Sequence, residues 1–437
     1  MEQIVIIGGG ASGLAAAISA ARELKKNLAY AKTDRGFLPI TIIEHNDSVG
    51  KKIPATGNGR CNLSNVCMLP ECFHTKQTSF VETVLSKFSF RETIMFFESM
   101  GLLTKSRLEY LYPRSSQASS VREVLEKTCR DLGVRVQTNS HVKSIKKSKT
   151  GANSHFVIEI SPEKKIESKR VLLANGGKAG PNFGCDGSGY AFAKTFGHII
   201  NPTLPALVQV SLLNNPLKQA NGIRVDATVS AITGNGIQKN AKDTGELQIT
   251  DYGISGIPVF QISRHISASL FAAGNPKVQI DFLPDLTREE ATNYFMKMIR
   301  RQAGNPGFTA FDLMLGLFPK RLILPLLTLS GILIKTPVSD LTGADVEALV
   351  GVCKKSLFGV SDTKGFENAQ TTLGGVELSQ ISPKTMESLL EKGLYFSGEI
   401  MDVDGKCGGY NLQWAWSTGY LAGKAMALDV LQNTNQA

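Results

Sequence analysis

The sequence lacks a hydrophobic run long enough to cross a membrane, and its start does not match a signal peptide. The best apolar candidate, LILPLLTLSGILI at residues 322–334, is shorter than the roughly 20 residues that a spanning helix needs, and Pro325 interrupts it. The opening MEQIVIIGGG has no basic region and runs directly into a strand-like pattern. We therefore expect a soluble, cytoplasmic protein with no membrane contact, in which residues 322–334 form a buried helical hairpin.

A recognisable metal-binding pattern is also missing. The chain has seven cysteines, and this odd number without a secretory signal favours reduced thiols over a disulfide framework. Cys61, Cys67, Cys72 and His74 lie close together in the sequence, but their spacing matches no zinc or iron–sulfur pattern. We expect no metal site.

Low-complexity tracts are absent, and the 42% of apolar residues can bury a substantial core divided among two or three domains. The formal net charge is +10, which could indicate a nucleic-acid partner. Much of the excess lies in two runs flanking FVIEI at residues 156–160, namely Lys143, Lys146, Lys147 and Lys149, then Lys164, Lys165, Lys169 and Arg170. No aromatic residues interleave with these lysines to stack on bases, so we interpret the runs as the solvated face of a hairpin.

The strongest local signal is QIVIIGGGASGLAAAISAAREL at residues 3–24. The apolar run at residues 4–7 is typical of a buried parallel strand, a G-x-G-x-x-G motif follows, and an alanine-rich helix comes next. In this motif the first glycine permits a tight turn, the second lets a pyrophosphate approach, and the third lets the helix pack on the strand. The predicted cofactor contacts here are Gly8, Gly10, Ala11, Ser12 and Gly13.

A second predicted strand, PITIIEHN at residues 39–46, carries Glu44 near its end. A carboxylate at this position is the expected partner of an adenosine ribose hydroxyl, and we include the adjacent His45 in the site. Glu44 follows Gly8 by 36 residues rather than the usual roughly 20, and the polar stretch at residues 25–39 accounts for the excess as a longer connection. Because a carboxylate disfavours a 2′-phosphate, we expect FAD or NAD rather than NADP.

The segment ATGNGRCNLSN at residues 55–65 is poor in helix and strand formers. A loop leaving the second strand returns across the carboxyl ends of the sheet, so this segment should line the dinucleotide. FAD, with its larger ring system, needs such a lining more than NAD does. The predicted contacts are Lys51, Lys52, Thr56, Gly57, Asn58, Gly59, Arg60, Cys61 and Asn62.

Four motifs together resemble those of a known family. They are GKKIPATGNGRCNLSN at residues 50–65, LYPRSSQASSV at 111–121, GELQITDYGISGIPVFQIS at 245–263 and LYFSGEIMDVDGKCGGYNLQWAWSTGYLAG at 394–423. The chain resembles, over essentially its whole length, the BaiN-type family of NAD(P)/FAD-dependent oxidoreductases, some of whose members are labelled aminoacetone oxidase. Many members carry histidine where this chain has Asp251.

The resemblance implies an α/β fold with a Rossmann-like FAD-binding domain of the glutathione-reductase type. We expect this domain to be discontinuous, at residues 1–196 and 356–437. A β-rich domain at 197–285 is inserted into it, as is a small helical domain at 286–355 whose first helix starts near Thr287. No second glycine motif follows, so we expect NAD(P)H to dock transiently.

Three further segments are expected near the cofactor. In this fold VRVQTNSHVKSIKKS at residues 134–148 reaches the adenine, so Val142 is a candidate contact, although an ordinary hairpin is an equal alternative. Paired glycines end the strand KRVLLANGG at 169–177 and occur again in TTLGGV at 371–376. The predicted contacts from the second segment are Ala174, Asn175, Gly176 and Gly177.

Near the end of the chain, paired glycines at residues 408–409 precede an apolar helix. The resemblance implies that the N-terminus of this helix faces the pyrimidine end of the flavin, where its dipole would stabilise negative charge on the reduced ring. The predicted contacts are Gly398, Glu399, Gly409, Tyr410, Asn411 and Leu412.

These expectations lead to an FAD-dependent oxidoreductase that acts on a small organic substrate. Reduced nicotinamide would supply hydride to the flavin, and an activated double bond would receive it. Candidate proton donors or substrate anchors are Tyr112, Arg114, Asp251 and Tyr252, all within the resembling motifs. One alternative is amine oxidation, with oxygen reoxidising the flavin. Another is a flavoprotein that binds RNA or a protein partner, in which the net charge of +10 would attract that partner.

Overall fold

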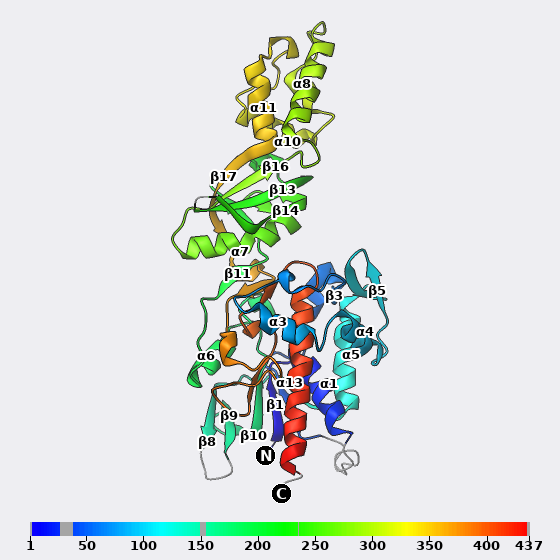
Figure 1. The fold of residues 1–437 in the computed structure, drawn as a ribbon, viewed down its shortest axis with the longest axis vertical. Helices are drawn as coiled ribbons and strands as arrows, with labels where there is room; N and C mark the ends of the chain where they lie inside the picture. Colours follow the sequence, from blue (N-terminus) through cyan, green and yellow to red (C-terminus); the bar gives the residue numbers. More distant parts are fainter. Residues whose placement is uncertain (1, 27–37, 149–153, 235, 435–437) are drawn as a thin grey trace. The chain divides into compact units, whose positions relative to one another are not determined.

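The computed structural model describes residues 2–26, 38–148, 154–234 and 236–434, and it divides into two compact units (Figure 1). Unit 1 comprises Met1–Thr203 and Thr371–Ala437, and unit 2 is the intervening Leu204–Gln370. Most of the long connection expected at residues 25–39 lies outside the described residues. Each unit has its own buried apolar cluster.

A seven-stranded sheet forms the centre of unit 1. Its order is β7-β2-β1-β10-β9-β8, and β19 also pairs with β10. The strands β7, β2, β1, β10 and β19 run parallel, whereas β9 and β8 are antiparallel to their neighbours. The bounds are β1 Glu2–Ile7, β2 Ile40–Ile43, β7 Arg135–Gln137, β8 Ser144–Ser148, β9 His155–Ser161, β10 Lys164–Leu173 and β19 Leu394–Phe396. Every residue of β2 is buried, as the continuous apolar run predicts for a strand covered on both faces.

The alternative that residues 134–148 form an ordinary hairpin is wrong. β7 pairs with β2 and β8 pairs with β9, so the two strands are separated in the sheet. The first lysine run lies on and beside β8 and the second on β10, so the runs flank β9, which pairs with both strands; Lys149 lies outside the described residues. The interpretation as a solvated face is wrong for Arg170, which is buried and pairs with Asp429.

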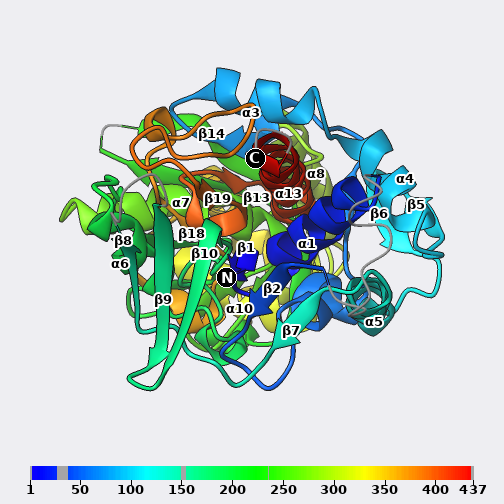
Figure 2. The same ribbon diagram turned by 90° about the horizontal axis from the view of Figure 1, so that it is seen from below.

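Two helices lie side by side over this sheet, α1 (Ala11–Leu24) and α13 (Tyr410–Thr434), as Figure 2 shows. Their close approach depends on glycines of α13. A Cβ atom at Gly419 would collide with the backbone oxygen of Ser12, and one at Gly423 with that of Ala16. The end of unit 1 therefore packs directly on its beginning.

Shorter elements complete unit 1. The helices are α3 Thr78–Leu85, α4 Phe90–Glu98, α5 Ala118–Asp131 and α6 Ser188–Thr195. The short strands are β3 Ser64–Asn65, β4 Phe73–His74, β5 Thr104–Arg107, β6 Tyr110–Pro113, β18 Thr371–Leu373 and β20 Asp404–Gly405. The 3-10 turns include η1 Ile53–Gly59 and η7 Gly398–Ile400.

Unit 2 contains a closed barrel in the order β12-β15-β14-β13-β16-β17. Its strands are β12 Val210–Leu212, β13 Arg224–Thr233, β14 Gly236–Ile249, β15 Gly253–Ser255, β16 Lys277–Asp281 and β17 Ser356–Thr363; β11 Leu204–Ala206 precedes them. The helices are α7 Ile257–Phe271, α8 Arg288–Gln302, α9 Ala310–Met314, α10 Lys320–Leu329, α11 Gly343–Lys355 and α12 Gly365–Asn368.

The observed division of the chain differs from the expected domain boundaries. Residues 356–363 form β17, which pairs with β12 and β16, and therefore belong to the barrel rather than to the first domain. Helices of the region 286–355 share one apolar cluster with the barrel strands. The described part of this region therefore has no hydrophobic core of its own, and residue 286 is not a domain boundary.

Two local predictions in this helical region have opposite outcomes. The predicted helix start at Thr287 is confirmed, because its side chain caps α8 by accepting from the backbone of Glu290. The predicted hairpin at 322–334 is wrong. Residues 320–329 form the single helix α10, with Pro325 inside it.

Candidate functional site

The glycine turn between β1 and α1 has three different environments. Gly8 has φ +103°, and a Cβ atom there would lie 2.5 Å from the backbone oxygen of Ala174. A Cβ at Gly13 would collide with the backbone oxygen of Gly8, which fixes how closely α1 lies to β1. At Gly10, by contrast, a Cβ would meet nothing within 4 Å. Open space at Gly10, before the first N–H groups of α1, fits a pyrophosphate.

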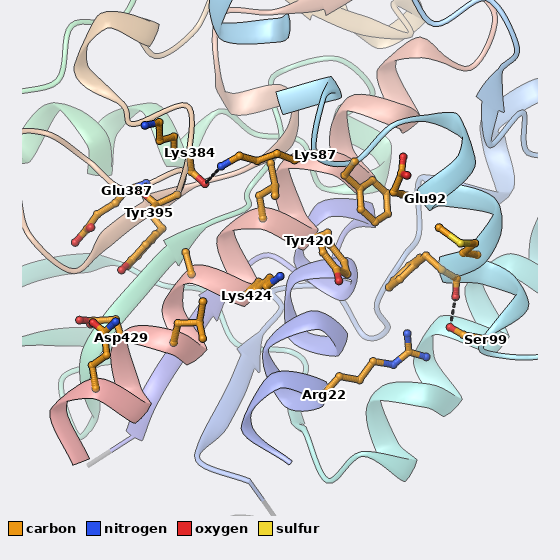
Figure 3. Close-up of a pocket in the computed structure, with 18 residues that line it drawn as sticks. Arg22, Lys87, Glu92, Ser99, Lys384, Glu387, Tyr395, Tyr420, Lys424 and Asp429 are labelled. Atoms are coloured by element: carbon orange, nitrogen blue, oxygen red, sulfur yellow. Dashed lines mark hydrogen bonds between the residues drawn. The ribbon is translucent and has the colours of Figure 1, made fainter. Parts of the chain in front are cut away.

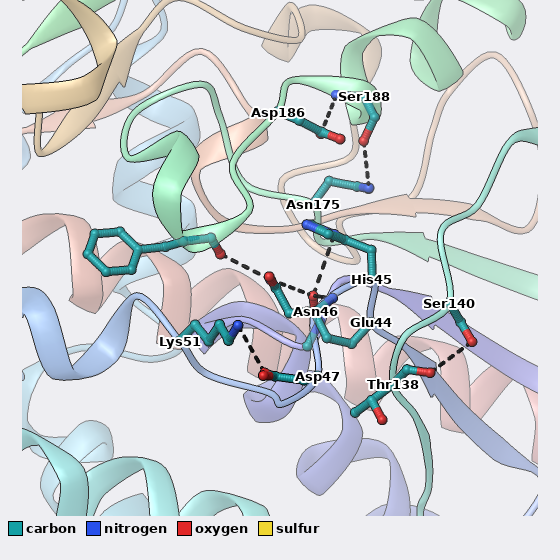
Figure 4. Close-up of polar contacts among 12 residues, drawn as sticks. Glu44, His45, Asn46, Asp47, Lys51, Thr138, Ser140, Asn175, Asp186 and Ser188 are labelled. Carbon is teal, nitrogen blue, oxygen red and sulfur yellow. Dashed lines mark hydrogen bonds and ion pairs between the residues drawn. The ribbon is translucent and has the colours of Figure 1, made fainter.

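Glu44 follows the last residue of β2 and is 6% exposed. Its Oε2 accepts from the backbone N–H of Gly9 at 2.8 Å, and its Oε1 accepts from the backbone and side-chain nitrogens of Asn46 at 2.8 and 2.9 Å (Figure 4). These bonds fix the carboxylate beside the glycine turn and leave acceptor capacity on Oε2, which accepts one hydrogen bond where Oε1 accepts two. This is the geometry expected of a ribose-binding carboxylate.

The segment that follows has an unusual backbone. Within and just after η1, Gly57, Asn58, Gly59 and Cys61 all have positive φ, between 53° and 80°. The Cys61 side chain is fully buried, and this burial raises the pKa of its thiol to about 12, so the thiol stays protonated and inert. A Cβ at Gly59 would meet nothing within 4 Å, so this part of the turn borders open space.

Two buried side-chain oxygens in the predicted site have no hydrogen-bond partner in the described structure, Asn62 Oδ1 and Asn175 Oδ1. Asn62 lies against the start of α13, since a Cβ at Gly409 would be 2.9 Å from its Oδ1. Asn175 follows β10 and its amide nitrogen is 3.5 Å from Ser188 Oγ. Buried polar atoms are rarely left without partners, so both oxygens fit acceptors for the N–H and hydroxyl groups of a flavin dinucleotide.

Lys52 and Glu399, both predicted cofactor contacts, bind each other. Lys52 Nζ lies 2.9 Å from Glu399 Oε2 and donates to the backbone oxygen of Ala179, also at 2.9 Å. Glu399 Oε1 accepts from the backbone and hydroxyl of Thr372 at 3.0 and 2.8 Å. The hydroxyl of Thr372 in turn accepts from the backbone of Lys178 and Ala179, so the network braces the loop after β10.

Thr372 was not among the predicted residues. It lies in TTLGGV, whose glycine pair predicts a close backbone approach but says nothing about the threonine. A Cβ at Gly177 would be 2.6 Å from Glu399 Oε1, which explains why a glycine is needed beside this network.

At the start of α13 the predicted residues have structural partners. The Asn411 side chain exchanges two hydrogen bonds with the backbone of Gly405, at 2.8 and 2.9 Å. The Tyr410 hydroxyl donates to the backbone oxygen of Cys67 at 3.0 Å. These bonds hold the turn at residues 405–409 in place at the start of α13.

The other predicted contacts occupy several places in unit 1. Thr56 donates to Ile53, Lys51 pairs with Asp47 at 2.9 Å, and the rings of His45 and His141 meet edge to face at 5.8 Å. Arg60 is exposed and Leu412 is half-buried. Val142 is buried between β7 and β8, and Gly176 and Gly398 have positive φ.

The four candidate proton donors or anchors divide between the units. Tyr112 on β6 is half-buried, and Arg114 just after it is exposed. Burial raises the pKa of the Tyr112 hydroxyl, although the nearby Arg60 and Arg107 act in the opposite direction, so it is protonated at neutral pH. In unit 2, Asp251 and Tyr252 lie between β14 and β15, with Lys364 Nζ 4.5 Å from the centre of the Tyr252 ring.

The described part of the chain has neither a metal-binding cluster nor a membrane-spanning helix. No group of three or more His, Cys, Asp or Glu side chains there is arranged to hold a metal ion. No described helix is long and apolar enough to cross a membrane.

At the carboxyl ends of parallel strands of unit 1 lie the glycine turn after β1, Glu44 after β2, Asn175 after β10 and Glu399 after β19. Rossmann folds bind dinucleotides at such strand ends. By its fold and its relatives, the chain is an FAD-dependent oxidoreductase of the Rossmann type. A family model described as the HI0933-like protein Rossmann domain matches residues 2–425, and the chain belongs to this family.

The sequences of two named relatives match nearly the whole chain. The 3-dehydro-bile acid delta(4,6)-reductase of Clostridium scindens is 47% identical over 427 residues, which are 98% of this chain and 99% of that protein. The ribosomal RNA dihydrouridine synthase of Escherichia coli is 28% identical over 420 residues, 95% of this chain and 96% of that protein. Among solved structures, a 3-ketosteroid delta1-dehydrogenase from Sterolibacterium denitrificans is 10% identical, with a TM-score of 0.49, over 98% of this chain and 99% of that chain.

Proposed function

We propose that the protein reduces a carbon–carbon double bond conjugated to a carbonyl group, in a steroid-like carboxylic acid, with NAD(P)H as the electron donor. The observation that carries this proposal is the 47% identity to a bile acid delta(4,6)-reductase over almost the full length of both proteins. Such coverage includes both units, so it extends to the regions that would select the substrate as well as to those that would hold FAD.

The chain's own residues would bind and orient the cofactor. Gly10 and the start of α1 would receive the pyrophosphate, and Glu44 would accept from the adenosine ribose. The amide oxygens of Asn62 and Asn175 would accept hydrogen bonds from the remainder of the cofactor. When bound, FAD supplies the hydride chemistry, which the protein side chains cannot perform.

Reduction of a conjugated double bond also requires a proton at the carbon that does not receive hydride. We propose Tyr112 as the donor, because its hydroxyl is half-buried and remains protonated at neutral pH. Arg114, which follows Tyr112 closely in unit 1, is proposed as a substrate anchor, and Asp251 and Tyr252 are proposed as anchors within unit 2. A carboxylate on the substrate would favour the exposed Arg114.

A second candidate is the reduction of a uridine in ribosomal RNA. It is favoured by the 28% identity to a ribosomal RNA dihydrouridine synthase and by the net charge of +10. Dihydrouridine is uridine with its conjugated ring double bond saturated, so the two candidates share their chemistry and differ in substrate.

The test is an anaerobic visible spectrum of the purified protein before and after adding NADH and then NADPH. We expect flavin bands that bleach with one nucleotide and return on adding a 3-oxo-4,6-diene steroid acid. Return of the bands with ribosomal RNA but not with the steroid would select the second candidate. Bands that neither nucleotide bleaches would contradict both and favour amine oxidation.

A further inference from the structure

Unit 1 contains a cavity of about 830 Å³ that the cofactor site does not use (Figure 3). Its walls come from α1, α4, α13 and the segment at residues 384–395. This volume lies within the range of roughly 300–1,000 Å³ typical of small-molecule sites.

The cavity is separated from the cofactor site along α13. The cofactor site includes the first turn of this helix at Tyr410, whereas the cavity begins at Tyr420 and continues toward Gln432. With a rise of about 1.5 Å per residue, the nearest wall is about 15 Å from the first turn. A ligand here would not contact the residues proposed above to bind FAD.

Aromatic rings form one wall of the cavity. The rings of Phe88 and Tyr420 stack with centroids 4.6 Å apart at 33°, and Phe96 meets them edge-on at 6.0 and 6.1 Å. Phe88 and Phe96 are buried, so they support the half-buried Tyr420, whose ring is the part of this wall that a ligand can reach.

Four cations surround this wall, Arg22, Lys87, Lys384 and Lys424. Within the described residues, none of them forms a salt bridge; Lys87 donates only to the backbone oxygen of Lys384, at 3.3 Å. The Arg22 guanidinium lies 5.6 Å from the centre of the Phe96 ring and is half-buried. Burial lowers the pKa of Arg22, as desolvation of a cation without a negative partner does.

One of the three acidic side chains of the same cavity has a cationic partner, since Asp429 pairs with the buried Arg170. Glu92 accepts from Ser89 in the capping box of α4, and Glu387 accepts from the backbone of Gly393 at 2.9 Å, but these neutral donors leave both carboxylates charged. Four cations face two such carboxylates, so the excess charge of the cavity is positive.

We propose that this cavity is a second binding site, for a small organic carboxylate with an apolar body the size of one or two rings. The body would pack on the Tyr420 ring, which Phe88 and Phe96 support, and the carboxylate would pair with Arg22 or Lys424, neither of which forms a salt bridge among the described residues. Charge and shape of the cavity carry the proposal, which does not depend on the proposed reaction.

Isothermal titration calorimetry on the FAD-loaded protein tests the proposal with two matched probes, 2-naphthoate and its uncharged analogue 2-naphthalenemethanol. We expect naphthoate to bind roughly tenfold more tightly than the alcohol, and Lys424→Glu to weaken naphthoate by roughly tenfold or more because it reverses a facing charge. Lys146→Glu, the same change at an exposed position on β8, should leave naphthoate affinity within about twofold.

Circular dichroism and the flavin spectrum verify that each variant is folded and loaded, and Arg22→Gln replaces Lys424→Glu if the latter is not. Equal affinity for the two probes would overturn the proposal. So would an equal loss in Lys146→Glu, or no naphthoate binding by the wild-type protein at millimolar concentration. None of these results bears on reduction of the flavin by NAD(P)H, so this proposal and the proposed function can fail separately.

Discussion

Lys52 Nζ lies 2.9 Å from Glu399 Oε2, and this ion pair joins two segments that are 347 residues apart in the chain. Through Ala179 and Thr372, the same pair holds the loop after β10. The side chains of Lys52 and Glu399 are only 28% and 19% exposed, so the pair is mostly buried and stabilises the loop after β10.

Glu399→Gln should destabilise the protein by about 1–3 kcal/mol, because it leaves a mostly buried ammonium group without its counter-charge. The loop after β10 would loosen, and FAD retention should fall with it. Chemical denaturation and the absorbance ratio of flavin to protein measure the two effects. The control is Lys127→Met, which removes the exposed pair with Asp131 and should cost at most about 1 kcal/mol. Equal losses in both variants would contradict a structural role for Glu399.

Gly10→Val should mainly weaken FAD binding, whereas Gly13→Val should mainly destabilise the fold. Gly10 has φ −76° and open space where its Cβ would be, so valine should change the stability of the FAD-free protein by no more than about 1 kcal/mol. It would, however, occupy the proposed pyrophosphate position and reduce FAD affinity by at least about tenfold. At Gly13 the collision with the backbone of Gly8 should instead destabilise the fold by about 2 kcal/mol or more.

Thermal denaturation of the FAD-free proteins and titration with FAD separate the two effects. A Gly10→Val protein that purified fully loaded with flavin would place the pyrophosphate elsewhere.

Tyr112→Phe should affect only one half of the proposed reaction. Loss of a general acid typically lowers the rate by about 100-fold or more, so reoxidation of the flavin by the steroid substrate should slow to this extent. Reduction of the flavin by NAD(P)H needs no proton from Tyr112 and should change less than about twofold. Stopped-flow absorbance measures both half-reactions. Equal slowing of the two would indicate that Tyr112 positions the flavin and is not a proton donor.

His198 should make the stability of unit 1 depend on pH. Its ring is buried, with Nε2 2.8 Å from Ser388 Oγ and the Phe396 ring at 4.7 Å, and burial lowers the pKa of the imidazole to about 4. Between the unfolded pKa of about 6.5 and the folded value, the unfolded chain binds a proton that the folded chain excludes. The free energy of unfolding should therefore fall as pH decreases through this window, by up to about 3 kcal/mol.

Urea denaturation at several pH values between 4 and 7.5, with His198→Gln for comparison, measures this contribution. The stability difference between the two proteins should narrow toward low pH. If the free energies of unfolding of the two proteins changed in parallel with pH, groups other than His198 would account for the pH dependence.

Local patterns in the sequence were enough to predict the glycine turn and Glu44. Each depends on neighbouring residues: an apolar run defines β1, three glycines define the turn, and Glu44 directly follows the apolar run of β2. The parallel strands and the discontinuity of the first domain followed from these signals together with the family resemblance.

Pairings between distant residues could not be predicted in the same way. Lys52 was expected to contact phosphate or ribose, and nothing near it in the sequence indicates that Glu399 is its partner. Similarly, SLFGVSDT at residues 356–363 has a weak strand pattern, and only its pairing with β12 and β16 assigns it to the barrel. Such contacts depend on how the whole chain folds, which a single sequence does not display.

The packing of α13 on α1 has a consequence for synthesis on the ribosome. Residues 204–370 emerge after β1 and α1 but before α13, and contain all the strands of their own barrel. The face of α1 that accepts Gly419 and Gly423 must therefore stay uncovered while the whole of unit 2 is translated. Unit 2 can fold as soon as it has emerged, whereas unit 1, the first to appear, is the last to be completed.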